Sequence, residues 1–124
     1  NDTVDILDPY IINIGIEFVV SVLRQNDASI AVDSAIATLA NNFTGGFFIG
    51  EHIEISDIYS ALKSVPEILD VVTVRLHNKT GTQYSNVEFS INKNISPDGG
   101  RLICPKNAIF EIKYADIDIK GKVR

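Results

Sequence analysis

The sequence contains no methionine, no tryptophan and only one cysteine in its 124 residues. A single thiol, Cys104, excludes an internal disulfide and any zinc site built from several cysteines. We expect Cys104 to be a small buried hydrophobic residue. Because the sequence contains no methionine and does not begin with one, we also expect the chain to be a fragment or a processed piece of a longer one.

Long apolar runs and dense basic runs are both missing. No stretch approaches the roughly 18 to 20 apolar residues that cross a bilayer, and the acidic start lacks the basic region of a signal peptide. Lysine and arginine number 11 against 16 aspartates and glutamates, which gives a net charge of -5. We therefore expect neither a membrane nor a nucleic acid as partner, since phosphate backbones attract clustered positive charge.

The few basic residues are unevenly distributed. Residues 1 to 70 carry a net charge of -9, and residues 71 to 124 carry +4. This division has two interpretations, which are chance and a contact between the acidic part of one subunit and the basic part of its neighbour. Complementary charge of that kind steers association and sets orientation.

What the sequence does contain is β-branched residues. Isoleucine occurs 19 times and valine 11 times, against 7 leucines, and this ratio favours strands. The hydrophobic share of 45% and the charged share of 22% are those of an ordinary folded domain. We expect a globular protein in which sheet dominates.

The spacing of apolar residues predicts the first half of the fold. We expect residues 1–9 to be an acidic linker from a preceding domain, and Tyr10–Val22 alternates in the period of a strand. Spacings of three and four then predict a helix over 28–43. After a short interrupted strand, a second helix begins near Ser56 and ends at Pro66, and a strand follows over Ile68–His77.

The second half is predicted to be strands. Three alternating segments cover Val87–Ile91, Phe110–Tyr114 and Ile117–Val123, and a change of apolar parity places a bulge or tight turn near Ala115 and Asp116. This order favours one α+β domain over residues 10–124. We expect a two-layer sandwich, in which a mostly antiparallel sheet has two helices on one face.

A sheet covered by helices on one face leaves the other for solvent or a partner. Strand parity assigns seven residues to that face, and we expect them to form an interface: Ile11, Glu17, Val19, Leu23, Val71, Arg75 and Ile109. Glu17 and Arg75 can also pair with each other across strands. An exposed ion pair and a role in partner recognition are both consistent with them.

No combination of residues indicates catalysis. The two histidines lie on separate elements, and the cluster Glu51, His52, Glu54 and Asp57 sits on a short strand where neighbouring side chains diverge. Gly45 and Gly46 lack the lysine and serine or threonine of a phosphate-binding loop. We expect no catalytic residues, no bound metal and no cofactor, and therefore not an enzyme.

Two segments carry a family resemblance. The segments IGEHIEISDIYSAL (residues 49–62) and VPEILDV (residues 65–71), preceded by the strand from Tyr10 to Phe18, resemble the baseplate J-like family of contractile-tailed bacteriophages. In that family, a strand, an amphipathic helix, an Ile-Gly-Glu segment, a Ser-Asp-Ile helix start and a valine-rich strand occur in this order. The resemblance covers about residues 8 to 76.

The resemblance implies the C-terminal domain of a baseplate wedge protein, a structural virion protein of the tail baseplate that is assembled in the host cytoplasm. Its implied partners are other copies of itself, through dimer contacts between wedge copies, and other wedge proteins. Two alternatives stay open. One is a regulatory domain of ferredoxin-like shape that binds a small molecule between subunits or beside Gly45 and Gly46, and the other is an enzyme.

Overall fold

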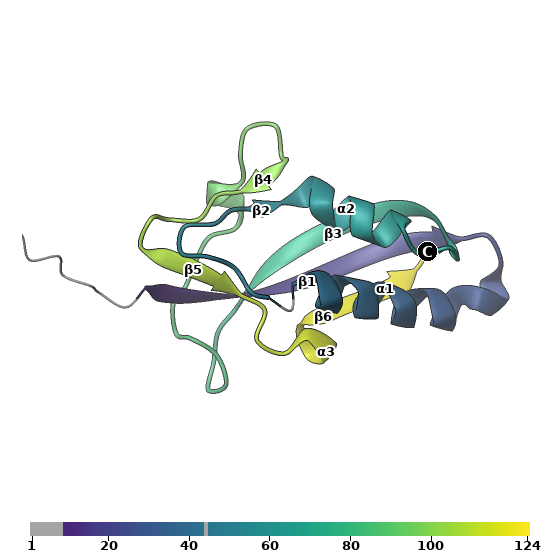
Figure 1. Cartoon of the computed structure of the whole chain (residues 1–124), viewed down its shortest axis with the longest axis horizontal. Coiled ribbons are helices and arrows are strands. Elements are labelled where there is room, and N and C mark those ends of the chain that lie inside the picture. Colours follow the sequence, from purple (N-terminus) through teal and green to yellow (C-terminus); the bar gives the residue numbers. More distant parts are fainter. Residues whose placement is uncertain (1–8, 44) are drawn as a thin grey trace, which may run out of the picture.

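The computed structural model describes residues 9–43 and 45–124, so the predicted acidic linker lies, except for Pro9, outside the described residues. Figure 1 shows strands and helices in the following order: β1 (Tyr10–Val22), α1 (Ala28–Asn42), β2 (Ile53–Glu54), α2 (Ile55–Lys63), β3 (Ile68–Lys79), β4 (Arg101–Leu102), β5 (Ala108–Glu111), α3 (Ala115–Asp118) and β6 (Ile119–Val123). Short 3-10 turns occur at Gln25–Asp27 and Asn92–Asn94. The predicted elements up to β3 are confirmed to within a few residues.

The sheet is organised around β1. Strand β3 runs antiparallel along one side of β1, from Asn13 opposite Lys79 to Val22 opposite Ile68. On the other side, β5 pairs with the first part of β1 and β6 with the later part, both in parallel. The predicted α+β class is confirmed and the longest pairing is antiparallel, but the parallel course of β5 and β6 was not expected.

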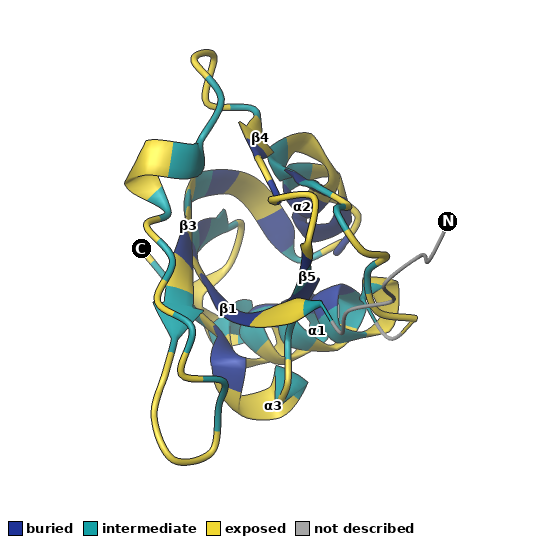
Figure 2. Ribbon diagram, turned by 90° about the vertical axis from the view of Figure 1, so that its left-hand side faces the viewer, coloured by how far each residue is buried: buried dark blue, intermediate teal, exposed yellow. Residues whose placement is uncertain are grey.

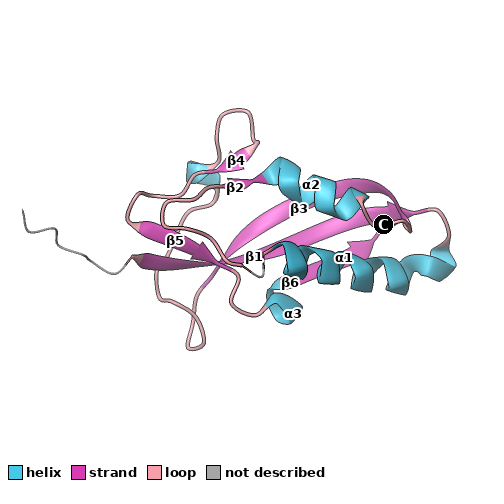
Figure 3. Cartoon of the chain, in the orientation of Figure 1, coloured by secondary structure: helices cyan, strands magenta, loops and turns pink. Residues whose placement is uncertain are grey.

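Both longer helices pack on the same face of this sheet. Figure 3 shows α1 and α2 in front of the strands, and Figure 2, turned by 90°, shows β3 on the left and α2 to its right. The core between the layers is built from the even-numbered residues of β1 and from the inner sides of α1 and α2: Ile12, Ile14, Ile16, Phe18, Val20, Ala31, Ala35, Leu39, Ile58, Ala61 and Leu62. The period-2 and helical patterns of the sequence both arise from this burial.

A close contact joins β6 to this core. Gly121 lies opposite Phe18 in the ladder, and the Phe18 ring covers the glycine so tightly that a Cβ there would lie 2.1 Å from two ring carbons. Phe18 is fully buried. The glycine therefore provides the space in which the largest buried side chain of β1 packs.

One predicted strand is absent and another begins later than predicted. Val87–Ile91 forms no described ladder. Asparagine side chains bond to the backbone here instead: Ser85 N, just before the segment, donates to Asn13 Oδ1 at 2.7 Å, and Phe89 N donates to Asn78 Oδ1 at 2.9 Å. The expected turn near Ala115 and Asp116 is the short helix α3. That helix occupies the start of the predicted last strand, so β6 begins only at Ile119.

Candidate functional site

The candidate site is the sheet face turned away from α1 and α2, which we call the back face. It carries the odd-numbered residues of β1 and their neighbours in β3 and β6. In one row Glu17 lies between Arg75 and Lys120, and in the next Val19 lies between Thr73 and Lys122. Side chains opposite each other in such rows have Cβ atoms about 5 Å apart.

The first half of the back face is covered, which corrects the expectation of a fully open face. The segment 79–85, which we call the strap, crosses it. A Cβ on Gly15 would lie 2.8 Å from Lys79 Cε and 3.1 Å from the Asp118 carbonyl oxygen, so a side chain there would displace Lys79 and press on the backbone of α3. Asn13, on the same face, is 1% exposed.

The buried amide of Asn13 is fully bonded. Its Nδ2 donates to Glu111 Oε1 at 2.7 Å, and its Oδ1 accepts from Ser85 N at the same distance. A buried polar group costs stability unless it is paired in this way. Asn13 therefore fastens the strap to the sheet and holds β5 against β1.

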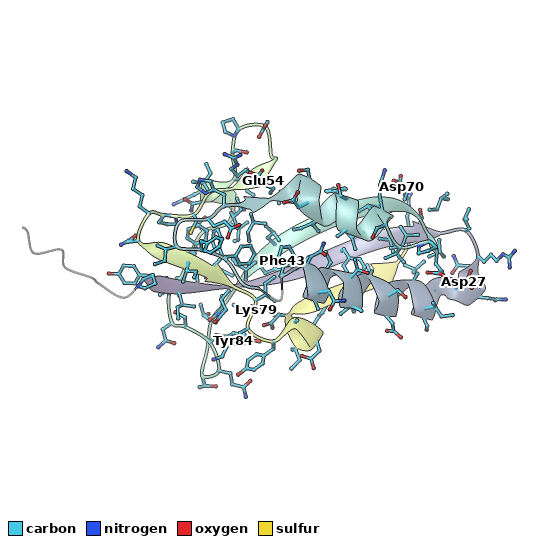
Figure 4. All side chains as sticks on the ribbon, viewed as in Figure 1. Asp27, Phe43, Glu54, Asp70, Lys79 and Tyr84 are labelled. Atoms are coloured by element: carbon cyan, nitrogen blue, oxygen red, sulfur yellow. The ribbon has the colours of Figure 1, made fainter. Side chains whose placement is uncertain are left out.

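A second attachment lies at the tip of the strap. Tyr84 Oη donates to Asp118 Oδ1 at 2.6 Å, and Asp118 Oδ2 accepts from Tyr114 N at 3.1 Å. The two tyrosine rings meet edge to face at 5.7 Å. The hydrogen bond to the Asp118 carboxylate raises the pKa of Tyr84 to about 12. Figure 4 labels Lys79 and Tyr84 in this region, near α3.

The second half of the back face has no such cover, and we call it the open half. Glu17, Thr73, Arg75, Lys120 and Lys122 are exposed there, and Val19 is half-buried. Three permanent cations thus surround one carboxylate. In a chain with a net charge of -5, this is a locally basic surface.

The predicted pairing of Glu17 with Arg75 is only partly realised. The two residues are opposite each other in the ladder, but the Glu17 carboxylate lies 3.8 Å from His77 Nε2 instead. Within the described part of the chain, no ion pair or hydrogen bond engages the Arg75 guanidinium. It is therefore available to a carboxylate from outside the molecule.

Val71 is a wrong prediction for this face. The β1–β3 register passes from Val19 opposite Thr73 to Val20 opposite Val71, so a bulge at Val72 turns Val71 towards the core. Its side chain is 8% exposed. Parity counted along an uninterrupted strand gives the opposite face.

The other predicted interface residues lie at the ends of the back face. Ile11 is 41% exposed and lies beside the half-buried Ile109, where β5 pairs with β1. Leu23, immediately after β1, is 70% exposed. The structure does not bring these three residues together with the open half in one contiguous site.

Sequence reasoning missed Lys120 and Lys122. Both follow the apolar Ile119 in alternation with Gly121 and Val123, which is a recognisable strand pattern. The sequence pattern does not show which strand β6 pairs with, and so it does not show that β6 runs parallel to the later part of β1. Only that pairing places the two lysines beside Glu17 and Val19.

The polar cluster considered for metal binding has other partners. Glu54 Oε1 lies 2.6 Å from Arg101 Nη2, and His52 Nδ1 accepts from Cys104 N at 2.8 Å. In the described ranges, no three His, Cys, Asp or Glu side chains are placed to hold a metal ion. Cys104 is buried as predicted, and burial raises the pKa of its thiol.

Comparisons with known proteins identify no relative. No family model, no curated protein and no solved structure matches this chain. Among the helices of residues 9–43 and 45–124, none is long and apolar enough to span a membrane.

Proposed function

We propose that this domain is a non-enzymatic assembly module, a wedge subunit domain of a phage tail baseplate that joins neighbouring copies around the tail hub. The family resemblance of residues 8 to 76 supports the proposal. So does the succession β1, α1, β2, α2 and β3, which follows the order of elements typical of that family. Other wedge proteins are further proposed partners.

The open half of the back face carries the proposal. It combines the apolar surface of Val19 with Arg75, Lys120 and Lys122 on a rigid sheet. The backbone of paired strands is already ordered, so a contact there costs less backbone entropy than one made by a loop. The strap covers the neighbouring half and leaves this surface as a defined patch.

The helix layer offers a complementary surface. Asp33 on α1 and Asp57 on α2 are both exposed, and α1 contains no basic residue. The open half of one copy can therefore face the helices of the next, which accounts for the opposite net charges of the two parts of the sequence. A contact between two different faces is heterologous and closes into a ring when the rotation permits.

Sedimentation velocity across a concentration series tests the proposal. We expect the domain to self-associate at high micromolar concentration, and Val19→Asp to weaken association without loss of cooperative unfolding. Lys122→Glu should do the same, whereas Lys106→Glu, an equal charge change on an exposed loop residue outside the patch, should not. A strictly monomeric wild type, or equal effects of both lysine variants, would contradict the proposed surface.

A further inference from the structure

A groove of about 670 Å³ runs along the outer edge of β3. Five consecutive residues, from Val74 to Asn78, line it. Because neighbouring side chains of a strand point to opposite faces, a groove lined by five in succession must follow the edge of the backbone. The groove therefore exposes the peptide groups of β3 as well as its side chains.

This edge of the sheet is unpaired. In the described part of the chain, β3 forms a ladder only with β1. Across the groove lies the segment Phe89–Asn92, which has no ladder to β3 and is joined to it by the bond from Phe89 N to Asn78 Oδ1. That bond closes the end of the groove near Asn78. Beyond the opposite end, near Val74, the bulge at Val72 interrupts the edge of β3.

Apolar side chains line the core side of the groove. They come from α2, from β3 and from the segment after the strap, and all but the buried Leu76 are partly exposed: Ile55, Tyr59, Val74, Leu76, Phe89, Ile91 and Ile95. An unpaired edge beside an apolar floor is the arrangement that binds an extended peptide by strand addition.

The back-face side of the same edge carries Arg75 and His77, and both are exposed. Arg75 supplies a permanent positive charge there, whereas His77 Nε2 lies 3.8 Å from the Glu17 carboxylate. Among the described residues that line the groove there is no aspartate or glutamate. Alternate side chains of an added strand would therefore meet two environments, with apolar floor on one side and positive charge on the other.

We propose that the β3 edge binds an extended segment of another protein, in which apolar residues alternate with acidic ones. The segment adds a strand beside Val74–Asn78. Its apolar side chains pack on Ile55, Tyr59 and Ile91, and its carboxylates meet Arg75 and His77. Backbone pairing supplies affinity, and the alternation supplies specificity.

The charges disfavour a second copy of β3 as the occupant. Two β3 edges paired with each other would bring the Arg75 guanidinium groups of both copies close together, and like charges in adjacent positions of a sheet are destabilising. The site shares Arg75 with the contact proposed above and is otherwise distinct from it. It uses the edge of β3, whereas assembly uses the surface around Val19 and Lys122.

Fluorescence anisotropy with labelled eight-residue peptides tests the inference on the whole chain. The probe alternates valine and aspartate, and we expect saturable binding. A peptide alternating valine and lysine should bind at least about tenfold more weakly, which corresponds to about 1.4 kcal/mol. Methylation of every backbone nitrogen in the aspartate peptide should abolish binding, because strand pairing needs those donors.

Variants assign the binding to this edge. Arg75→Glu should weaken the aspartate peptide and strengthen the lysine peptide, and Ile91→Asp should weaken the aspartate peptide. Lys106→Glu is the matched charge control, and thermal unfolding confirms that each variant is folded. Val19→Asp should leave peptide binding unchanged, which separates this site from the assembly surface.

Three results would overturn the inference. One is absence of saturable binding to the aspartate peptide, another is equal binding of the methylated peptide, and the third is an unchanged charge preference in Arg75→Glu. Closure of the groove by the chain's own segment Val87–Ile91 would also overturn it. In that case Ile91→Asp would raise peptide affinity by freeing the edge.

Discussion

Replacement of Gly121 by alanine tests the packing of β6 against the core. The new Cβ would lie 2.1 Å from two carbons of the Phe18 ring and 2.6 Å from a third. Ordinary carbon contacts are about 3.5 to 4.0 Å, so the ring or the strand must move by about 1.5 Å. Phe18 is 0% exposed, and protein cores are packed too densely to absorb such a shift without cost.

The size of the effect follows from two opposing contributions. Over-packing of a tight core costs about 1 to 3 kcal/mol, and the rigid ring places this site at the upper end. Alanine also lowers the conformational entropy of the unfolded chain, and this effect raises the free energy of unfolding by about 0.4 to 1 kcal/mol. We expect a net loss of about 2 kcal/mol in the free energy of unfolding, and a Tm lower by about 8 °C for a domain of this size.

Chemical and thermal unfolding monitored by circular dichroism measure this loss. Gly45→Ala is the control, since its Cβ meets nothing within 4 Å, and it should change stability by less than about 0.5 kcal/mol. Phe18→Leu removes the ring with which the new methyl group collides. The loss of unfolding free energy in the double variant Phe18→Leu/Gly121→Ala should therefore be smaller than the sum of the losses in the two single variants. A stable Gly121→Ala protein, or simple additivity with Phe18→Leu, would refute the proposed contact.

Three further outcomes are expected. Val71→Ala should lower the free energy of unfolding by about 1 to 2 kcal/mol, because the bulge makes this side chain part of the core, and an unchanged denaturation midpoint would contradict that placement. Asn13→Ala should cost about 1 to 3 kcal/mol, because it leaves the Ser85 amide without its acceptor, and faster hydrogen exchange at that amide would locate the loss. The bond to Asp118 raises the pKa of Tyr84 to about 12, so this bond stabilises the fold fully below the ordinary tyrosine value of 10.0, and the stabilisation is lost as pH rises through about 12. Ultraviolet titration should show a tyrosine that ionises late, and Tyr84→Phe should remove it.

The sequence predicts the first half of the fold well because its signals there are long. Thirteen residues of β1 alternate without interruption, and each helix presents a continuous apolar stripe. Such patterns result directly from burial of one side of an element. The error at Val71 has a local cause: one inserted residue, Val72, reverses the parity of β3 as far as a second register shift at Leu69, and alternation alone does not reveal a bulge.

The second half was harder to predict because its contacts are not periodic. Val87–Ile91 alternates like a strand, yet the Asn78 side chain accepts from Phe89 N, and the Asn13 side chain accepts from Ser85 N just before the segment. These bonds span 11 and 72 residues of sequence, so the alternation of the segment itself does not reveal them. The parallel course of β6 depends on the same long-range folding, which places Lys120 and Lys122 in the candidate site.

The boundary between the covered and open halves of the back face is a matter of residue size and charge. At Gly15 the absence of a side chain lets Lys79 and the carbonyl of Asp118 approach the sheet closely. Two residues later, Glu17 presents a carboxylate that an apolar cover would have to desolvate, and such burial costs several kcal/mol without a partner. The cover therefore ends between these positions. Any molecule that binds beyond them must supply polar groups for Glu17 and Arg75, which favours a charged protein surface over an apolar one.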